Sequence, residues 1–172
     1  MKIAVLFANG TEEIEALTPV DVLRRANVEC DLVSISGEKP IGSHNIIIKA
    51  DKQIEQVDLS DYDGVVIPGG MPGAVNISNC KKAMNGIKKL LEDKKLVSAI
   101  CASPAVVLAE NKMLSVEKAT CYPAQAFINS LGEKYTATNV EVSKNVITAN
   151  GPKSAMAFSL AICEYLKVNP KF

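Results

Sequence analysis

Short apolar runs along the chain alternate with segments in which apolar residues recur every three or four positions. The first run covers residues 3–8 and is apolar almost throughout, which is typical of a parallel strand covered on both faces. Residues 11–26 then follow a helical period, with acidic residues near the expected start of the helix. A strand followed directly by a helix indicates the start of a βα unit.

The same succession continues along the rest of the chain. Strands are predicted at residues 28–35, 45–49, 62–68 and 96–100, with an antiparallel hairpin over 140–149 that turns at Lys144 and Asn145. Helices are predicted at residues 74–93, after Cys101, and at 152–167. This order favours a three-layer α/β fold, with helices on both faces of a mostly parallel sheet. No linker or repeat interrupts residues 1–172, so we predict one domain.

The charge balance limits the classes of partner. The chain has 19 Lys and Arg against 19 Asp and Glu, so its net charge attracts neither nucleic acid nor an anionic membrane. No apolar stretch approaches the roughly 20 residues of a membrane helix, and no targeting leader is evident. We therefore expect a cytoplasmic protein with a small-molecule or protein partner, no nucleic acid and no membrane.

The five cysteines are scattered and lack the paired spacing of a zinc site. We expect free thiols and no metal. The chain also lacks GxGxxG and GxxxxGK[ST] motifs, which disfavours a nucleotide, so no cofactor is predicted.

The chemistry is expected at Cys101. An apolar strand leads directly into Cys101, and Pro104 suits the first turn of a following helix. This pattern resembles a nucleophile elbow, in which the helix N-terminus favours the thiolate. A buried cysteine at a strand end is the simpler interpretation, and the flanking residues favour the nucleophile.

The preceding strand ends at Pro68, Gly69 and Gly70. Two glycines allow the backbone to turn with N–H groups pointing into the crevice, where they could hold an oxyanion. The same three residues also form ordinary turns. Their position one βα unit before Cys101 is what favours the oxyanion hypothesis.

The first predicted helix supplies three acidic candidates, Glu12, Glu13 and Glu15. An ionised carboxylate beside Cys101 would raise the pKa of the thiol, whereas a protonated one could donate a hydrogen bond to the thiolate. The acid that works with Cys101 must therefore be neutral. The residues alone do not choose among the three, and all three could be solvated.

The segments ANGTEEIEALTPVDVLRRA, VVIPGGMPGA, AICASPAVVLAE, TCYP and NGPKSAMAFSLAI together resemble the successive signature segments of the DJ-1/ThiJ/PfpI superfamily, in its DJ-1-like branch. The resemblance spans essentially the whole chain. It implies a flavodoxin-like fold, a homodimer, a reactive Cys101 with a protonated Glu15, and an oxyanion pocket near Gly70 and Ala102.

The resemblance also concerns residues away from Cys101. It places Arg25 and His44 near the pocket across the dimer interface. Many relatives carry a histidine close to the cysteine, where this chain has Tyr122. For His44, the only histidine, a surface or interface role is favoured over catalysis.

Three functions follow from the resemblance. In the first, a glyoxalase III or deglycase-like activity, Cys101 adds to methylglyoxal or its adducts, with turnover weakened by the missing histidine. In the second, a redox sensor, Cys101 is oxidised to a sulfinic acid stabilised by Glu15. The third, a PfpI-like peptidase or amidase, is disfavoured because amide cleavage needs an acid for the leaving amine. The sequence does not rank the first two.

Overall fold

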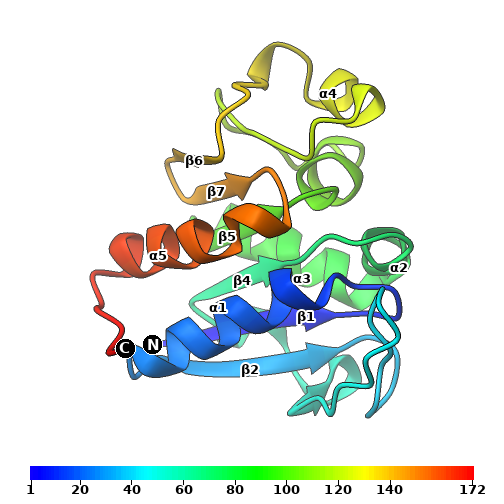
Figure 1. Ribbon diagram of the computed structural model, residues 1–172, viewed down its shortest axis with the longest axis vertical. Helices are drawn as coiled ribbons and strands as arrows, with labels where there is room; N and C mark the ends of the chain where they lie inside the picture. Colours follow the sequence, from blue (N-terminus) through cyan, green and yellow to red (C-terminus); the bar gives the residue numbers. More distant parts are fainter.

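The structure is a computed structural model that describes residues 1–172, and its centre is a seven-stranded sheet (Figure 1). The strands lie in the order β3-β2-β1-β4-β5-β7-β6, and all neighbours are parallel except β6 and β7. Their bounds are β1 Lys2–Phe7, β2 Glu29–Ser34, β3 Lys52–Gln53, β4 Gly64–Ile67, β5 Leu96–Ile100, β6 Val140–Ser143 and β7 Val146–Ala149. The predicted mostly parallel sheet and the hairpin are confirmed.

Helices cover both faces of this sheet. Helices α1 (Glu13–Arg25) and α5 (Ala155–Leu166) lie side by side on one face, and α3 (Lys81–Glu92) lies on the other (Figure 1). The remaining helical segments are α2 (Gly73–Asn79), α4 (Gln125–Leu131), a π-helix Pro104–Ala109, and 3-10 turns Ile54–Gln56, Leu59–Asp61, Gly132–Lys134 and Pro152–Ser154. None of the helices combines the length and the apolar composition that a membrane crossing requires.

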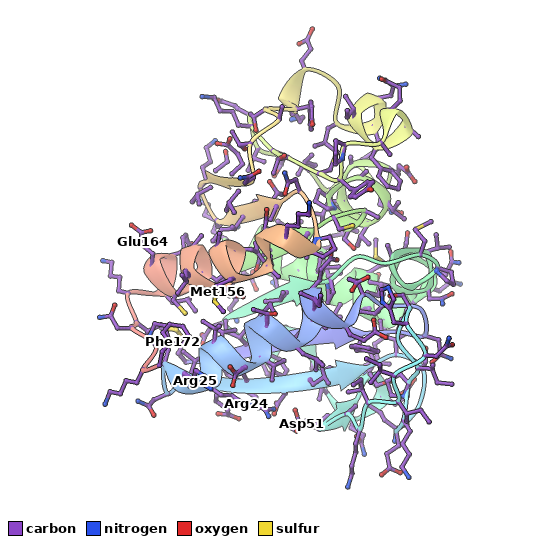
Figure 2. All side chains as sticks on the ribbon, in the orientation of Figure 1. Arg24, Arg25, Asp51, Met156, Glu164 and Phe172 are labelled. Atoms are coloured by element: carbon purple, nitrogen blue, oxygen red, sulfur yellow. The ribbon has the colours of Figure 1, made fainter.

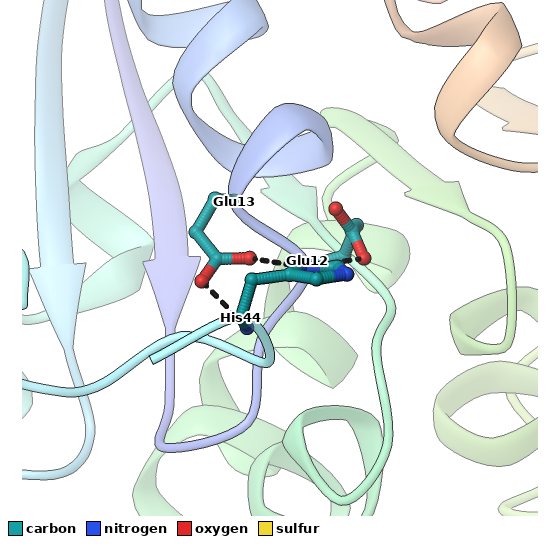
Figure 3. Close-up of side chains that lie close together, drawn as sticks. All are labelled: Glu12, Glu13 and His44. Carbon is teal, nitrogen blue, oxygen red and sulfur yellow. Dashed lines mark hydrogen bonds and ion pairs between the residues drawn. The ribbon is translucent and has the colours of Figure 1, made fainter. Parts of the chain in front are cut away.

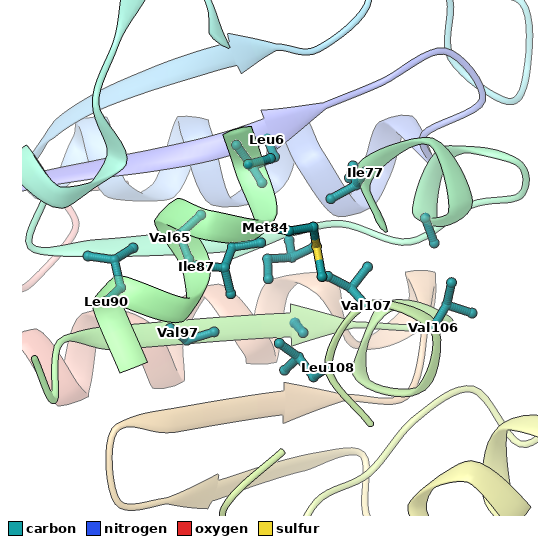
Figure 4. Packing of buried hydrophobic residues seen from close by; sticks show 14 of the residues in the cluster. Leu6, Val65, Ile77, Met84, Ile87, Leu90, Val97, Val106, Val107 and Leu108 are labelled. Carbon is teal, nitrogen blue, oxygen red and sulfur yellow. The ribbon is translucent and has the colours of Figure 1, made fainter. Parts of the chain in front are cut away.

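The apolar runs are explained by burial on both faces of the sheet. Along β1, Ile3, Val5 and Phe7 join the 20-residue cluster under α1 and α5, whereas Ala4 and Leu6 join the 28-residue cluster on the opposite face. Figure 4 shows part of the larger cluster, where strand residues meet those of α3 and the π-helix. Each central strand is thus apolar at both odd and even positions.

The predicted strand at residues 45–49 is wrong. Asn45 has a left-handed backbone with φ of 61°, and the segment folds back so that the Gly42 N–H donates to the Ile46 carbonyl at 2.9 Å. Ile46 and Ile47 are 51% and 64% exposed, so no buried face holds this segment in the sheet. The edge strand is β3 instead.

The predicted helix at residues 74–93 is two helices. Cys80 ends α2 and precedes α3 in an extended conformation, with ψ of 99°. The asparagines and serine of the segment NISN just before Cys80 favour caps and turns over helix interiors, which accounts for the break. Helix α4 was not predicted.

Candidate active site

Three loops meet at one edge of the sheet, beyond the carboxyl ends of β1, β4 and β5. The chain order reverses between β1 and β4, which is where open α/β sheets bind ligands. The Glu12 N–H donates to the Gly69 carbonyl at 3.1 Å, and the Ser103 hydroxyl donates to the Pro68 carbonyl at 2.6 Å. These bonds join the loops after β1, β4 and β5. The role of the buried Ser103 was not predicted from the sequence.

Cys101 has a strained backbone at the turn between β5 and the π-helix. Its φ of 66° lies in the left-handed region, which costs a residue with a side chain roughly 1–2 kcal/mol. Two hydrogen bonds hold it there: its N–H donates to the Ala149 carbonyl at 2.9 Å, and its carbonyl accepts from the Tyr122 N–H at 2.8 Å. A half-buried cysteine on such a turn has the geometry of a nucleophile elbow.

Glu15 lies within α1 and is completely buried. Its Oε2 accepts from the Gly69 N–H at 2.8 Å, whereas its buried Oε1 has no hydrogen-bond partner. Burial raises the pKa of Glu15 to about 7, although the hydrogen bond from Gly69 opposes the rise. The carboxyl is therefore neutral in mildly acidic solution, as the sequence argument required of an acid paired with Cys101.

The Cys101 thiol is coupled to Glu15. Burial, and then repulsion by the Glu15 carboxylate, raise the pKa of Cys101 to about 12, while the N–H groups of Gly70 and Ala102 act in the opposite direction. The N–H groups after Cys101 thus favour the thiolate, as the elbow pattern predicts, but burial and the charge of Glu15 outweigh them. A protonated Glu15 removes the repulsion and can donate from Oε1, so the thiolate requires the Glu15 proton.

Gly69 allows these two acids to lie close together. A Cβ atom on Gly69 would lie 2.6 Å from the Cys101 Cβ and 2.8 Å from the Glu15 Oε2, so no side chain fits. Its N–H is already donated to Glu15, which leaves the N–H groups of Gly70 and Ala102 beside the sulfur. These are the two amides for which the family resemblance implies an oxyanion pocket, a role that stays a prediction.

Tyr122 lines a cleft whose lining does not include Cys101, and its N–H donates to the Cys101 carbonyl at 2.8 Å. It is 46% exposed, and its ring lies 3.3 Å from where a Cβ on Gly151 would be. The cleft has a volume of about 520 Å³. Its other lining residues were not predicted as site residues: Pro123, Asn139, Asn150, Gly151, Pro152, Lys153 and Ser154.

Glu12 and Glu13 are engaged with His44 (Figure 3). The His44 Nδ1 lies 2.9 Å from the Glu13 Oε2 and 3.6 Å from the Glu12 Oε2. Burial opposes ionisation of Glu13, but hydrogen bonds from His44 and Ser43 outweigh it and lower the pKa of Glu13 to about 2. The hydrogen bond to Glu13 also raises the pKa of His44. Of the three acids, only Glu15 is coupled to Cys101.

These three side chains are also the group with metal-ligand spacing, since their ligand atoms lie within 4.8 Å of one another. Both Glu13 oxygens already accept hydrogen bonds, from the His44 N–H at 2.8 Å, from the His44 ring and from Ser43. A metal ion would have to displace these bonds.

Arg25 is not brought to Cys101 within one chain. It lies at the end of α1, about 15 Å along the helix axis from Glu15. Its Nε donates to Asp21 at 2.8 Å, and its guanidinium lies 5.7 Å from the centre of the Phe172 ring (Figure 2). A contribution of Arg25 to a neighbouring pocket stays a prediction.

Comparison with known proteins finds one matching family model and relatives that are similar over nearly the whole chain. Residues 1–165 match the model of the DJ-1/PfpI family. "Protein DJ-1 homolog B" of Arabidopsis thaliana is 34% identical over 168 residues, covering 96% of this chain and 38% of the relative. The chain spans about two fifths of the length of the two Arabidopsis relatives it matches. "Glutathione-independent glyoxalase DJR-1.2" of Caenorhabditis elegans is 33% identical over 157 residues, covering 91% of this chain and 83% of that protein.

The solved structures agree with the fold. The structure of oxidized Toxoplasma gondii DJ-1 superposes with a TM-score of 0.92 at 39% identity, covering 96% of this chain and 90% of that one. The flavodoxin-like α/β fold implied by the sequence resemblance is thereby confirmed. The chain belongs to the DJ-1/PfpI family.

Proposed function

We propose that the protein is a cofactor-free enzyme of the glyoxalase III or deglycase type that acts on methylglyoxal or its adducts through Cys101. The observation that carries the proposal is the pairing of Cys101, on a strained turn, with a buried carboxyl whose Oε1 has no other partner. The name of the C. elegans relative supports the same class of substrate.

The first step is addition of the Cys101 sulfur to the aldehyde carbon. With Glu15 protonated, the thiolate attacks, and the aldehyde oxygen becomes negatively charged as the carbon–sulfur bond forms. The N–H groups of Gly70 and Ala102, which lie beside the sulfur, are positioned to stabilise that oxygen. Transfer of the Glu15 proton to this oxygen gives a neutral hemithioacetal and leaves Glu15 ionised, as the base for the next step.

The second step is a proton shift within the hemithioacetal. One proton leaves the carbon bonded to sulfur and another reaches the neighbouring carbon, which gives a thioester of lactate. Water then releases lactate and restores the Cys101 thiol, so that methylglyoxal plus water gives lactate. A positioned acid or base contributes about 10²- to 10⁴-fold to the rate of such a step. Because Tyr122 stands in place of a histidine, Glu15 is the one acid and base for both proton transfers. We therefore expect slow turnover.

Formation of D-lactate from methylglyoxal tests the proposal. Wild type should produce it and Cys101→Ser should not, whereas Cys80→Ser, which changes a half-buried cysteine between α2 and α3, should retain the activity. Equal lactate formation by wild type and Cys101→Ser would exclude this function.

A redox sensor is the second candidate, and the neutral Glu15 favours it. A sulfinate on Cys101 is an anion, and a protonated Glu15 can donate a hydrogen bond to it. Mild peroxide should add two oxygen atoms to Cys101 in wild type, and Glu15→Gln should change the extent of that product, as measured by peptide mass spectrometry. A PfpI-like peptidase is not favoured within one chain, because the only histidine, His44, is not among the groups that act on the Cys101 thiol.

The proposal includes a homodimer that acts in the cytoplasm. Exposed apolar side chains on α1 and α5 support a self-complementary face: Ile14 is 53%, Met156 47% and Leu160 39% exposed. In this dimer Arg25 and His44 would approach the pocket of the other protomer. Light scattering at micromolar concentration tests the dimer, and a monomer would remove any role for those two residues at the site.

A further inference from the structure

The cleft that Tyr122 lines is built onto the backbone of Cys101. The Tyr122 N–H donates to the Cys101 carbonyl at 2.8 Å, and the Cys101 N–H donates to the carbonyl of Ala149, the residue before Asn150. Both Tyr122 and Asn150 line the cleft. The cleft therefore begins within one residue of the bonds that fix the elbow.

The cleft is larger than a three-carbon aldehyde needs. Its volume of about 520 Å³ lies in the range of roughly 300–1,000 Å³ that is typical of sites for much larger ligands. A substrate that reacts at Cys101 can therefore carry a second portion that the cleft accommodates.

Two asparagines of the cleft are hydrogen-bonded to each other, which leaves part of the lining free to donate. The Asn150 Oδ1 accepts from the Ser154 hydroxyl at 2.6 Å, and the Asn150 Nδ2 donates to the Asn139 Oδ1 at 3.0 Å. Each of the two carboxamide oxygens thus already accepts one hydrogen bond within the protein. The side-chain donors available to a ligand are the Asn139 Nδ2, the Tyr122 hydroxyl and the ammonium of Lys153, which is exposed and takes part in none of the ion pairs of the structure.

The charge of the cleft is positive, because Lys153 is its only charged lining residue and no Asp or Glu lines it. A carboxylate offers acceptors only, and a hydrogen bond to it from an ammonium or an amide N–H is stronger than one between neutral groups. The lining is therefore complementary to a carboxylate.

We infer that the cleft beside Cys101 binds the carboxylate of the substrate through Lys153 and Asn139, so that the preferred substrates are α-oxoaldehydes, or their adducts, that carry a carboxylate group away from the reacting carbon. The inference rests on the proposed function for the reacting end of the substrate. Lys153 sets specificity in it and takes no part in the bond changes.

Two matched substrates test this class. Phenylglyoxal bearing a 4-carboxylate and phenylglyoxal bearing a 4-carboxamide differ in charge and little in size. In wild type the KM for the carboxylate should be the lower of the two. In Lys153→Gln the ratio of the carboxamide KM to the carboxylate KM should fall about tenfold, the loss expected for one charge-assisted hydrogen bond.

Lys144→Gln is the matched control. It removes the same charge from the turn at the other end of β7, about 20 Å along the strand direction from Asn150. That separation exceeds the Debye length of about 8 Å at physiological salt. The KM ratio of Lys144→Gln should equal that of wild type, and an equal fall in both variants would overturn the assignment to Lys153.

A second measurement requires no turnover. Iodoacetate and iodoacetamide both alkylate Cys101 as its sulfur displaces iodide, and only iodoacetate is an anion. The ratio of the iodoacetate rate to the iodoacetamide rate at Cys101 is followed by peptide mass spectrometry. It should fall about threefold in Lys153→Gln at low salt and stay unchanged in Lys144→Gln.

The two measurements separate the inference from the proposed function. If no phenylglyoxal is converted but the alkylation ratio falls in Lys153→Gln, the enzymatic function is wrong and the anion site stands. If both substrates are converted but wild type and Lys153→Gln have the same KM ratio and the same alkylation ratio, the anion site is wrong.

Discussion

Glu15→Gln should remove a pH dependence of stability that the buried carboxyl creates. Burial raises the pKa of Glu15 from its ordinary 4.5 to about 7. The folded state thus favours the neutral carboxyl, and this contribution is fully present below pH 4.5 and is lost as the pH rises through 7. The rise in pKa corresponds to about 3 kcal/mol of unfolding free energy. Glutamine has a similar shape, can accept from the Gly69 N–H, and does not ionise.

Urea unfolding of both proteins at pH 4 and pH 8 measures this effect. The unfolding free energy of wild type minus that of Glu15→Gln is the quantity of interest. It should be about 3 kcal/mol lower at pH 8 than at pH 4. Effects of other titrating groups cancel because both proteins share them. Glu164→Gln, on the exposed side of α5, provides a control that should show little change (Figure 2). A difference that is the same at both pH values would refute the assignment of a buried neutral carboxyl.

Further predictions concern the neighbours of Glu15. Gly69→Ala should cost about 1–3 kcal/mol of unfolding free energy and abolish turnover, because its Cβ would lie 2.6 Å from the Cys101 Cβ. Wild-type activity in this variant would contradict the geometry. In timed alkylation followed by mass spectrometry, Cys101 should be the first of the five cysteines to react, and labelling of Cys80 or Cys121 well before Cys101 would count against the elbow. Tyr122→His should increase lactate formation, and equal rates in wild type, Tyr122→His and Tyr122→Phe would show that the proton transfers run through Glu15 or water.

The fold could be predicted where a segment is buried on both faces, because nearly every residue of such a segment is apolar. Strands β1, β4 and β5 are covered on both faces, so their apolar runs identify them. The same rule fails at residues 45–49, where the isoleucines of an exposed turn have the composition of a strand. It fails again at Cys80, since the pattern of one long helix and that of two consecutive helices over the same core differ little.

The site could be predicted in part. The elbow at Cys101 depends on local order, a strand followed by a turn and a proline, and local order is visible in the sequence. The choice of Glu15 depends on its hydrogen bond with Gly69, which is 54 residues away, so residue spacing alone left Glu12 and Glu13 as equals. The cleft residues Asn139 and Lys153 come together only through tertiary structure, and although Lys153 lies in the signature segment NGPKSAMAFSLAI, the resemblance gave it no role.

The Cys101–Glu15 pair governs both candidate functions through one proton. Loss of the first proton, near pH 7, leaves a single negative charge that resides either on Glu15 or, with Glu15 protonated, on the sulfur, in a proportion that pH does not change. The rate of alkylation at Cys101 should therefore rise to about pH 7 and then level off, whereas an isolated thiol with a pKa near 12 would react about tenfold faster with each pH unit. When Cys101 adds to an aldehyde, the aldehyde oxygen takes up a proton, and the catalytic cycle can continue. When Cys101 is oxidised to a sulfinate, the negative charge stays on Cys101 and the proton stays on Glu15. Glu15 thus enables turnover and would also stabilise the oxidised form of Cys101. Glu15→Gln should therefore affect both lactate formation and sulfinate formation. The rate at which a proton returns through Tyr122 or water decides which of these two reactions dominates.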